Sequence, residues 1–224
     1  VNLKEDDLTQ VGTVEKLADF IRQRKTKEQI EAINWGEILR ETTNLKLPQS
    51  WFTYNILKNF ARIILRMYFR LKAEGIENIP NGPIILAPNH QSFFDGLFVA
   101  TSLQNKIFKS TYFYAKEKHV RKSWVKFIAN RHNVIVMDIN KDLKSSLQNL
   151  AEVLRKGRNI IIFPEGTRTR DGKLGDFKKT FAILSRELNV PVVPVAIKGA
   201  YEALPRGSRF PRPFKKINIK FYQP

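Results

Sequence analysis

Residues 83–95 read Pro-Ile-Ile-Leu-Ala-Pro-Asn-His-Gln-Ser-Phe-Phe-Asp. The apolar run 83–87 predicts a short, fully buried strand, and the residues from Phe94 to Leu103 predict a helix that follows it. Open α/β sheets bind their ligands beyond the carboxyl ends of the strands. The polar loop between this strand and this helix is therefore the first place to look for a site.

The same alternation of short apolar runs and amphipathic helices continues on both sides of that loop. It predicts strands at 110–114, 134–137, 159–163, 192–197 and 217–222, and helices at 51–71, 143–155 and 177–188. Gly157 marks the end of the second of these helices. Strands that alternate with helices indicate a layered α/β domain, which we place at residues 49–224. Residues 25–48 are interpreted as a linker helix and its connection.

Composition narrows the function classes. With 42% hydrophobic and 27% charged residues, the 224-residue chain has the balance of a folded domain. It has no cysteine, which excludes disulfides, thiolate nucleophiles and sulfur-ligated metals. Its three histidines make a multi-histidine metal site a poor hypothesis, so we expect no metal and no cofactor.

The net charge of +18 favours a polyanionic partner: nucleic acid, an anionic membrane face or phosphorylated substrates. Zinc spacings, recognition-helix motifs and paired RNA-binding aromatics are missing from the sequence, so nucleic acid is not expected. No segment has the roughly 20 apolar residues of a membrane span. Helix 51–71 interleaves aromatic residues with the cations Lys58, Arg62, Arg66 and Arg70, as an interfacial helix on anionic lipid does; packing within its own domain is the alternative. We expect a peripheral protein on the cytoplasmic face of a membrane.

His90 and Asp95 are candidate catalytic residues. Five residues turn a helix by roughly 500°, so the two do not share a helical face. They can meet if His90 ends the strand and Asp95 lies in the first turn of the next helix. Asp95 would then fix the imidazole tautomer, and the other ring nitrogen could take a proton from a hydroxyl. A purely structural hydrogen bond is the alternative.

A second loop, Phe163-Pro164-Glu165-Gly166-Thr167-Arg168, follows another buried strand. Gly166 permits an unusual backbone angle, and the planar guanidinium of Arg168 suits a phosphate. Thr167 adds a hydroxyl donor. The alternative is an ordinary connection with solvated arginines.

Together these loops and the run Val190-Pro-Val-Val-Pro-Val-Ala-Ile197 resemble the glycerolipid acyltransferase family over residues 52–224. The resemblance implies a mixed sheet flanked by helices, as in glycerol-phosphate acyltransferases. It implies that His90 is a general base oriented by Asp95. It also implies that the acceptor binds through Glu165, Gly166, Thr167 and Arg168, in an element that begins with Phe163 and Pro164, and that Lys116 lies near the active site.

The implied reaction is transfer of a fatty acyl group from a thioester, acyl-CoA or acyl-carrier protein, to a lysophospholipid such as 1-acylglycerol 3-phosphate. We expect backbone amides after the first strand, and Lys116, to stabilise the oxyanion. The family usually has Asp-Arg where this chain has Asp138-Ile139, and Phe-Lys-Lys-Gly where it has Thr180 as the fourth residue. The first departure favours a lysophospholipid with a larger head group as an alternative acceptor. A catalytically inactive membrane-docking module is a further alternative.

The first 24 residues separately resemble the last helix of an acyl carrier protein, and an ordinary amphipathic helix is the alternative. On this interpretation the chain is part of a longer protein with an upstream carrier domain, which would present the donor within the same polypeptide.

Overall fold

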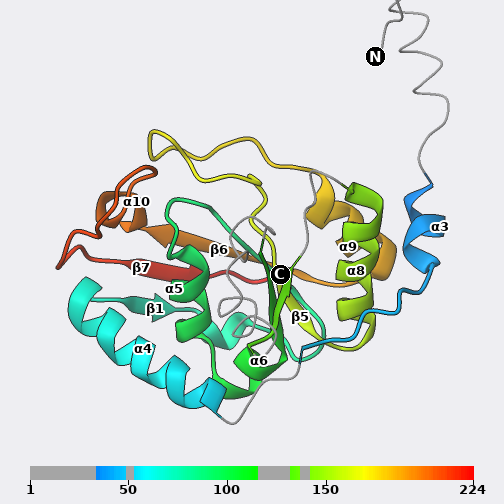
Figure 1. Ribbon diagram of the computed structural model, residues 1–224, viewed down its shortest axis with the longest axis horizontal. Coiled ribbons are helices and arrows are strands. Elements are labelled where there is room, and N and C mark those ends of the chain that lie inside the picture. The colour runs from blue at the N-terminus through cyan, green and yellow to red at the C-terminus, as the bar shows by residue number, and fades with distance from the viewer. Residues whose placement is uncertain (1–33, 49–52, 116–131, 137–141) are drawn as a thin grey trace, which may run out of the picture. The chain divides into compact units, whose positions relative to one another are not determined.

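The computed structural model describes residues 34–48, 53–115, 132–136 and 142–224 (Figure 1). The carrier-like helix, most of the linker helix, Lys116 and Ile139 therefore lie outside the described residues. Contacts divide the chain into two units, residues 1–37 and 38–224. Everything below concerns the second unit, except that helix α3 (Trp35–Arg40) begins in the first.

A seven-stranded sheet runs through the described residues in the order β1-β7-β6-β2-β5-β3-β4 (Figure 1). The strands are β1 (Lys72–Glu74), β2 (Ile85–Pro88), β3 (Thr111–Ala115), β4 (Val134–Val136), β5 (Asn159–Ile161), β6 (Val192–Lys198) and β7 (Asn218–Phe221). Five strands, from β6 to β4, are parallel, whereas β7 pairs antiparallel with β6 and parallel with β1. The mixed sheet flanked by helices is confirmed. Strand β1 was not predicted, because a three-residue edge strand reading Lys-Ala-Glu has no apolar pattern.

The helices are α4 (Thr53–Phe69), α5 (Asp95–Ser102), α6 (Asn105–Ser110), α8 (Leu143–Arg155), α9 (Thr180–Leu188) and α10 (Ala200–Ala203), with a 3₁₀ turn at Ile76–Asn78. The four predicted from periodicity form, and α6 and α10 were missed because each is too short to show a period. Asp142 caps α8 by accepting a hydrogen bond from the amide of Ser145 at 2.9 Å. Gly157, at φ 70°, follows the end of that helix as predicted. None of the helices in the described segments is both long and apolar enough to cross a membrane.

Helices pack on both faces of the sheet because successive strand residues point to opposite sides. On β2, Leu86 belongs to the core cluster formed with α4 and α5, which includes Phe69 and Phe98. Its neighbour Ile85 is equally buried but lies outside that cluster. The buried face of α8 (Leu147, Leu150 and Leu154) packs with α9 and β5 and is also outside it. The central strands β2 and β5 are thus covered on both sides, and the loops after them leave the sheet at one edge.

One buried cation joins the helices of the first face. Lys58 of α4 is 3% exposed, and its ammonium donates to the carbonyl of Leu103, which ends α5, and to Asn105 Oδ1 at the start of α6, at 2.9 Å to the latter. Burial lowers the pKa of Lys58 to about 8. The ammonium thereby ties the C-terminal end of α5 and the start of α6 to α4, so the prediction that Lys58 is one of the membrane-facing cations of this helix is wrong.

Candidate active site

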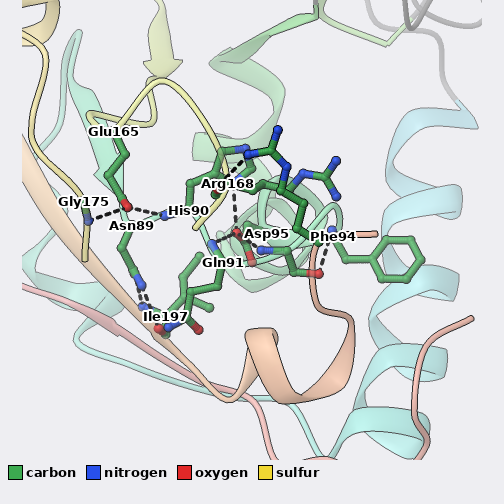
Figure 2. A network of polar contacts seen from close by, with 11 residues as sticks. Asn89, His90, Gln91, Phe94, Asp95, Glu165, Arg168, Gly175 and Ile197 are labelled. Atoms are coloured by element: carbon green, nitrogen blue, oxygen red, sulfur yellow. Dashed lines mark hydrogen bonds and ion pairs between the residues drawn. The ribbon is translucent and has the colours of Figure 1, made fainter. Parts of the chain in front are cut away.

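His90 and Asp95 meet as their spacing predicted. His90 follows the end of β2, and Asp95 is the first residue of α5. The ring Nδ1 of His90 lies 2.9 Å from Asp95 Oδ2 (Figure 2). The Asp95 side chain is fully buried, whereas that of His90 is 21% exposed. With an ionised carboxylate as acceptor, Nδ1 carries the proton and Nε2 is left as a proton acceptor.

The carboxylate of Asp95 is held mainly by the backbone of its own loop. Besides the ring, Oδ2 accepts from the amides of Gln91 at 2.6 Å and Ser92 at 2.7 Å. Burial raises the pKa of Asp95 above its ordinary value, and the hydrogen bonds from His90 and from the Ser92 amide oppose that rise. Residues 90–95 therefore form a closed turn in which the loop itself fixes the carboxylate.

Asn89 anchors the other end of this turn. Its side-chain amide imitates a strand residue: Nδ2 donates to the carbonyl of Ile197 at 3.0 Å, and Oδ1 accepts from the amide of Ile197 at 2.6 Å. The pairing of β2 with β6 thus continues one residue past Pro88, directly before His90. Sequence reasoning missed this role of Asn89, because its partner Ile197 lies 108 positions further along the chain.

Glu165 joins the second loop to the first. It is 5% exposed, and its two carboxylate oxygens accept from the amide of His90 at 2.7 Å and from the amide of Gly175 at 2.8 Å (Figure 2). The amide of Thr169 also donates to the carbonyl of His90 at 2.8 Å. Both backbone polar groups of His90 are therefore held by the loop after β5.

The rest of the Phe-Pro-Glu-Gly-Thr-Arg element divides into two groups. The Phe163 ring stacks on the His90 ring with centroids 4.0 Å apart, and Pro164 is buried beside it. Gly166 has a φ of 68°, the unusual backbone angle that was predicted, and its amide donates to the carbonyl of Phe163. Thr167 is exposed and Arg168 is half-buried, and the Arg168 guanidinium lies 5.9 Å from the centre of the Phe93 ring. Phe93 is exposed and belongs to the loop that carries His90, so Arg168 lies close to the His90 turn.

Two hollows adjoin the pair. An apolar pocket of about 470 Å³ is lined by Asn89, Gln91 and Pro164 near the pair and by Phe177, Phe181 and Pro194 further away. A second pocket of about 630 Å³ is lined mainly by charged and polar side chains, including Thr167, Arg168, Lys173, Lys178 and Arg206. Leu174 lines both pockets, so they lie on either side of one loop.

The amides expected to bind an oxyanion are already engaged. Those of His90, Gln91 and Ser92 donate to Glu165 and Asp95 at 2.6–2.7 Å. The prediction that the first amides after β2 form the oxyanion site is wrong for these three, because their N–H groups donate hydrogen bonds to two buried carboxylates. Lys116, the other candidate, lies outside the described residues. Within the described part of the chain, no cluster of His, Asp and Glu could hold a metal ion.

A histidine held by a buried carboxylate at the end of a central parallel strand, beside an apolar pocket lined by its neighbours Asn89 and Gln91, has the geometry of a general base. The chain belongs to the acyltransferase family, whose description "Acyltransferase" matches it over residues 70–198. That match contains both loops of the site.

Similar proteins point the same way. The chain is 33% identical over 162 residues to the chloroplastic 1-acyl-sn-glycerol-3-phosphate acyltransferase LPAT1 of Arabidopsis thaliana, covering 70% of this chain and 44% of the relative. It is 30% identical to the 1-acyl-sn-glycerol-3-phosphate acyltransferase of Pseudomonas aeruginosa, covering 66% and 55%. The crystal structure of the 1-acyl-sn-glycerophosphate acyltransferase PlsC from Thermotoga maritima superimposes with a TM-score of 0.61 at 28% identity, covering 76% of this chain and 68% of that one. The chain spans less than half the length of the Arabidopsis relative.

Proposed function

We propose that this chain transfers a fatty acyl group from a thioester to the free hydroxyl of a lysophospholipid, 1-acylglycerol 3-phosphate being the acceptor favoured by its named relatives. The observation that carries the proposal is the His90–Asp95 pair. A buried carboxylate lies 2.9 Å from Nδ1 of a partly exposed imidazole. This is the arrangement that a general base requires.

The reaction is a single displacement. The acceptor hydroxyl attacks the thioester carbonyl and gives its proton to Nε2 of His90. The charge of Asp95 stabilises the resulting imidazolium. When the tetrahedral intermediate collapses, the carbon–sulfur bond breaks and His90 returns the proton to the leaving thiolate. The products are an ester and a thiol, and the donor is either acyl-CoA or an acyl-carrier protein.

The two pockets fit an amphiphilic acceptor. The apolar pocket, lined by Phe177, Phe181 and Pro194, suits an acyl chain. The cationic pocket, with Arg168 at its edge, suits a phosphate. Asn89 and Gln91, on either side of His90, line the apolar pocket, and Glu165, which accepts from the His90 amide, lines the cationic one. One lysophospholipid can therefore place its tail, head group and hydroxyl around the same imidazole.

Membrane association is the second part of the proposal. Helix α4 exposes six large apolar side chains, and the most exposed, Met67, is 74% accessible. They are Ile56, Leu57, Phe60, Ile63, Ile64 and Met67. Arg66 and Arg70 are exposed on or directly after the same helix. An apolar face accompanied by cations favours a peripheral position on an anionic membrane, on the side that supplies the acyl thioester.

The catalytic proposal is tested with His90→Ala. Labelled acyl-CoA and acyl-carrier protein are incubated with a panel of lysophospholipids, and the products are identified by mass. Because the general base is removed, turnover should fall by about two to four orders of magnitude while the protein stays folded by circular dichroism. The control is His132→Ala, which removes a histidine that lines a groove beside α4. This variant should keep most of the activity. A folded His90→Ala protein that retains most of its turnover would contradict the mechanism.

A further inference from the structure

Besides Arg168 and Arg170, the cationic pocket contains Arg206, which comes from a distant part of the chain. Arg206 lies after α10, in a segment held by two backbone hydrogen bonds, from Ser208 to Pro205 at 3.1 Å and from Arg212 to Ala203 at 2.8 Å. Its Nη1 lies 3.4 Å from Thr167 Oγ1 and 3.4 Å from the carbonyl of Arg168. The guanidinium of Arg206 is therefore placed against the turn that carries Arg168.

The acidic side chains of the pocket leave its cations available. Glu165 is occupied by two backbone amides. Asp171 accepts from the backbone amide of Lys173 and from the Thr169 hydroxyl, each at 3.1 Å, and these hydrogen bonds lower its pKa. Asp176 is the remaining carboxylate of the lining. The cations are Arg168, Arg170, Lys173, Lys178 and Arg206. The pocket is thus built for an anion.

We infer that Arg206 and Arg168 together bind the phosphate of the acceptor, and that Arg206 selects a phosphate monoester over a diester. A monoester phosphate carries close to two negative charges at neutral pH, whereas a diester carries one and has an oxygen blocked by its second substituent. Two guanidinium groups match two charges and offer planar pairs of donors. This inference rests on the proposed function, because it assigns the acceptor of that reaction.

The test compares Arg206→Ala, Arg206→Lys and the wild-type chain with lysophosphatidic acid, lysophosphatidylglycerol and acyl-CoA as the varied substrates. Loss of a charged hydrogen-bonding partner should raise the KM for lysophosphatidic acid by about tenfold or more and leave kcat nearly unchanged. The KM for lysophosphatidylglycerol should rise much less, and Arg206→Lys should recover part of the loss. Arg209→Ala is the matched control: it removes the same charge from the same segment, where Arg209 lies over the Phe210 ring and outside the pocket.

Other outcomes overturn the inference. If Arg206 only braces the turn through Thr167, kcat and the KM values of both acceptors and of the donor should change together. A rise confined to the KM of acyl-CoA, whose coenzyme also carries a phosphate monoester, would assign the pocket to the donor. Failure of the proposed function looks different, because the wild-type chain would then acylate no lysophospholipid. Calorimetric titration with glycerol 3-phosphate still reports on Arg206 in that case: the wild-type chain should bind it more tightly than Arg206→Ala, and equal binding contradicts the inference.

Discussion

At the scale of single residues, the site depends on two buried carboxylates that accept hydrogen bonds from backbone amides. Asp95 accepts from two amides of its own loop as well as from His90, and Glu165 accepts from the amides of His90 and Gly175. Charge-assisted hydrogen bonds of this kind are stronger than neutral ones and fix their partners in place. The two carboxylates therefore have different roles: Asp95 contacts the imidazole of His90, whereas Glu165 contacts its backbone amide.

Asp95→Asn should separate activity from stability. The amide oxygen of Asn can replace Oδ2 as acceptor, but it lacks the charge that stabilises the imidazolium, so kcat should fall by about two to four orders of magnitude.

Because burial raises the pKa of Asp95, the folded state binds the proton more tightly than the unfolded state. Ionisation of Asp95 therefore lowers the free energy of unfolding of the wild-type protein. This loss develops as the pH rises through the pKa that Asp95 has in the folded state. The free energy of unfolding of Asp95→Asn, relative to wild type, should increase from acid to neutral pH in urea titrations. A variant that grows less stable than wild type over this range would contradict the assignment.

Glu165→Gln tests whether Glu165 positions His90 or binds the acceptor. A neutral amide can accept from one of the two backbone amides but presents an NH₂ group to the other. The variant should lose about 1–3 kcal/mol of unfolding free energy, the cost of one unsatisfied buried donor. It should lower kcat and leave the KM of the acceptor nearly unchanged. Asp176→Asn, a neutralised carboxylate in the lining of the cationic pocket, should change neither kcat nor stability by a comparable amount. A raised acceptor KM with an unchanged kcat would instead support direct binding by Glu165.

At the scale of elements, helix α4 has one face in the core and one exposed. Tyr54, Leu65 and Phe69 are buried, whereas Phe60, Ile63 and Met67 are more than half exposed. The interpretation of packing within its own domain is therefore confirmed for one face of α4. The other face is apolar and exposed, and its docking on a membrane stays a prediction. A groove of about 520 Å³ between α4 and Leu97 of α5 extends that surface.

Vesicle sedimentation tests the membrane role of α4. The chain should bind phosphatidylglycerol vesicles and ignore phosphatidylcholine vesicles. Each cation near the surface contributes about 1 kcal/mol, which salt screens, and the apolar side chains add a part that salt does not remove. Binding should therefore weaken at high salt without vanishing.

Reversing Arg62, Arg66 and Arg70 to Glu should abolish this binding. The control is a triple variant in which Lys144, Arg158 and Arg186, on or beside α8 and α9, are changed to Glu. It changes the net charge by the same amount and should still bind the vesicles. Equal loss in both triple variants would show that net charge, and not α4, drives the association. A wild-type chain that remains in the supernatant at low salt would contradict the proposal for this helix.

At the scale of the whole molecule, the sheet order assembles the site. Because β2 lies between β5 and β6, the loops after β2 and β5 and the end of β6 meet at one edge of the sheet. Asn89 reaches Ile197 on one side, and the His90 backbone reaches Glu165 and Thr169 on the other. The turn of residues 90–95 is thus supported by segments 75 and 108 positions away in the chain.

The sequence by itself determined the larger elements and the meeting of His90 with Asp95. The apolar periods of the central strands and of α4, α8 and α9 are local signals, and burial on both faces makes them strong. His90 and Asp95 are five residues apart at a strand-to-helix junction, so their meeting required only local geometry. The two short elements α6 and α10 and the edge strand β1 lack such a period, which is why they were not predicted.

Only the tertiary structure decided which groups are free to act. The amides after β2 were expected to bind an oxyanion, but Asp95 and Glu165 occupy those of residues 90–92. From sequence, Ile139 placed a phosphate monoester acceptor in doubt. Arg206, 38 positions beyond Arg168, becomes a candidate partner for that phosphate only when the chain folds. Hydrogen-bond partners far apart along the chain leave no period or spacing in the sequence, because the order of strands in the sheet sets them and no local pattern encodes that order.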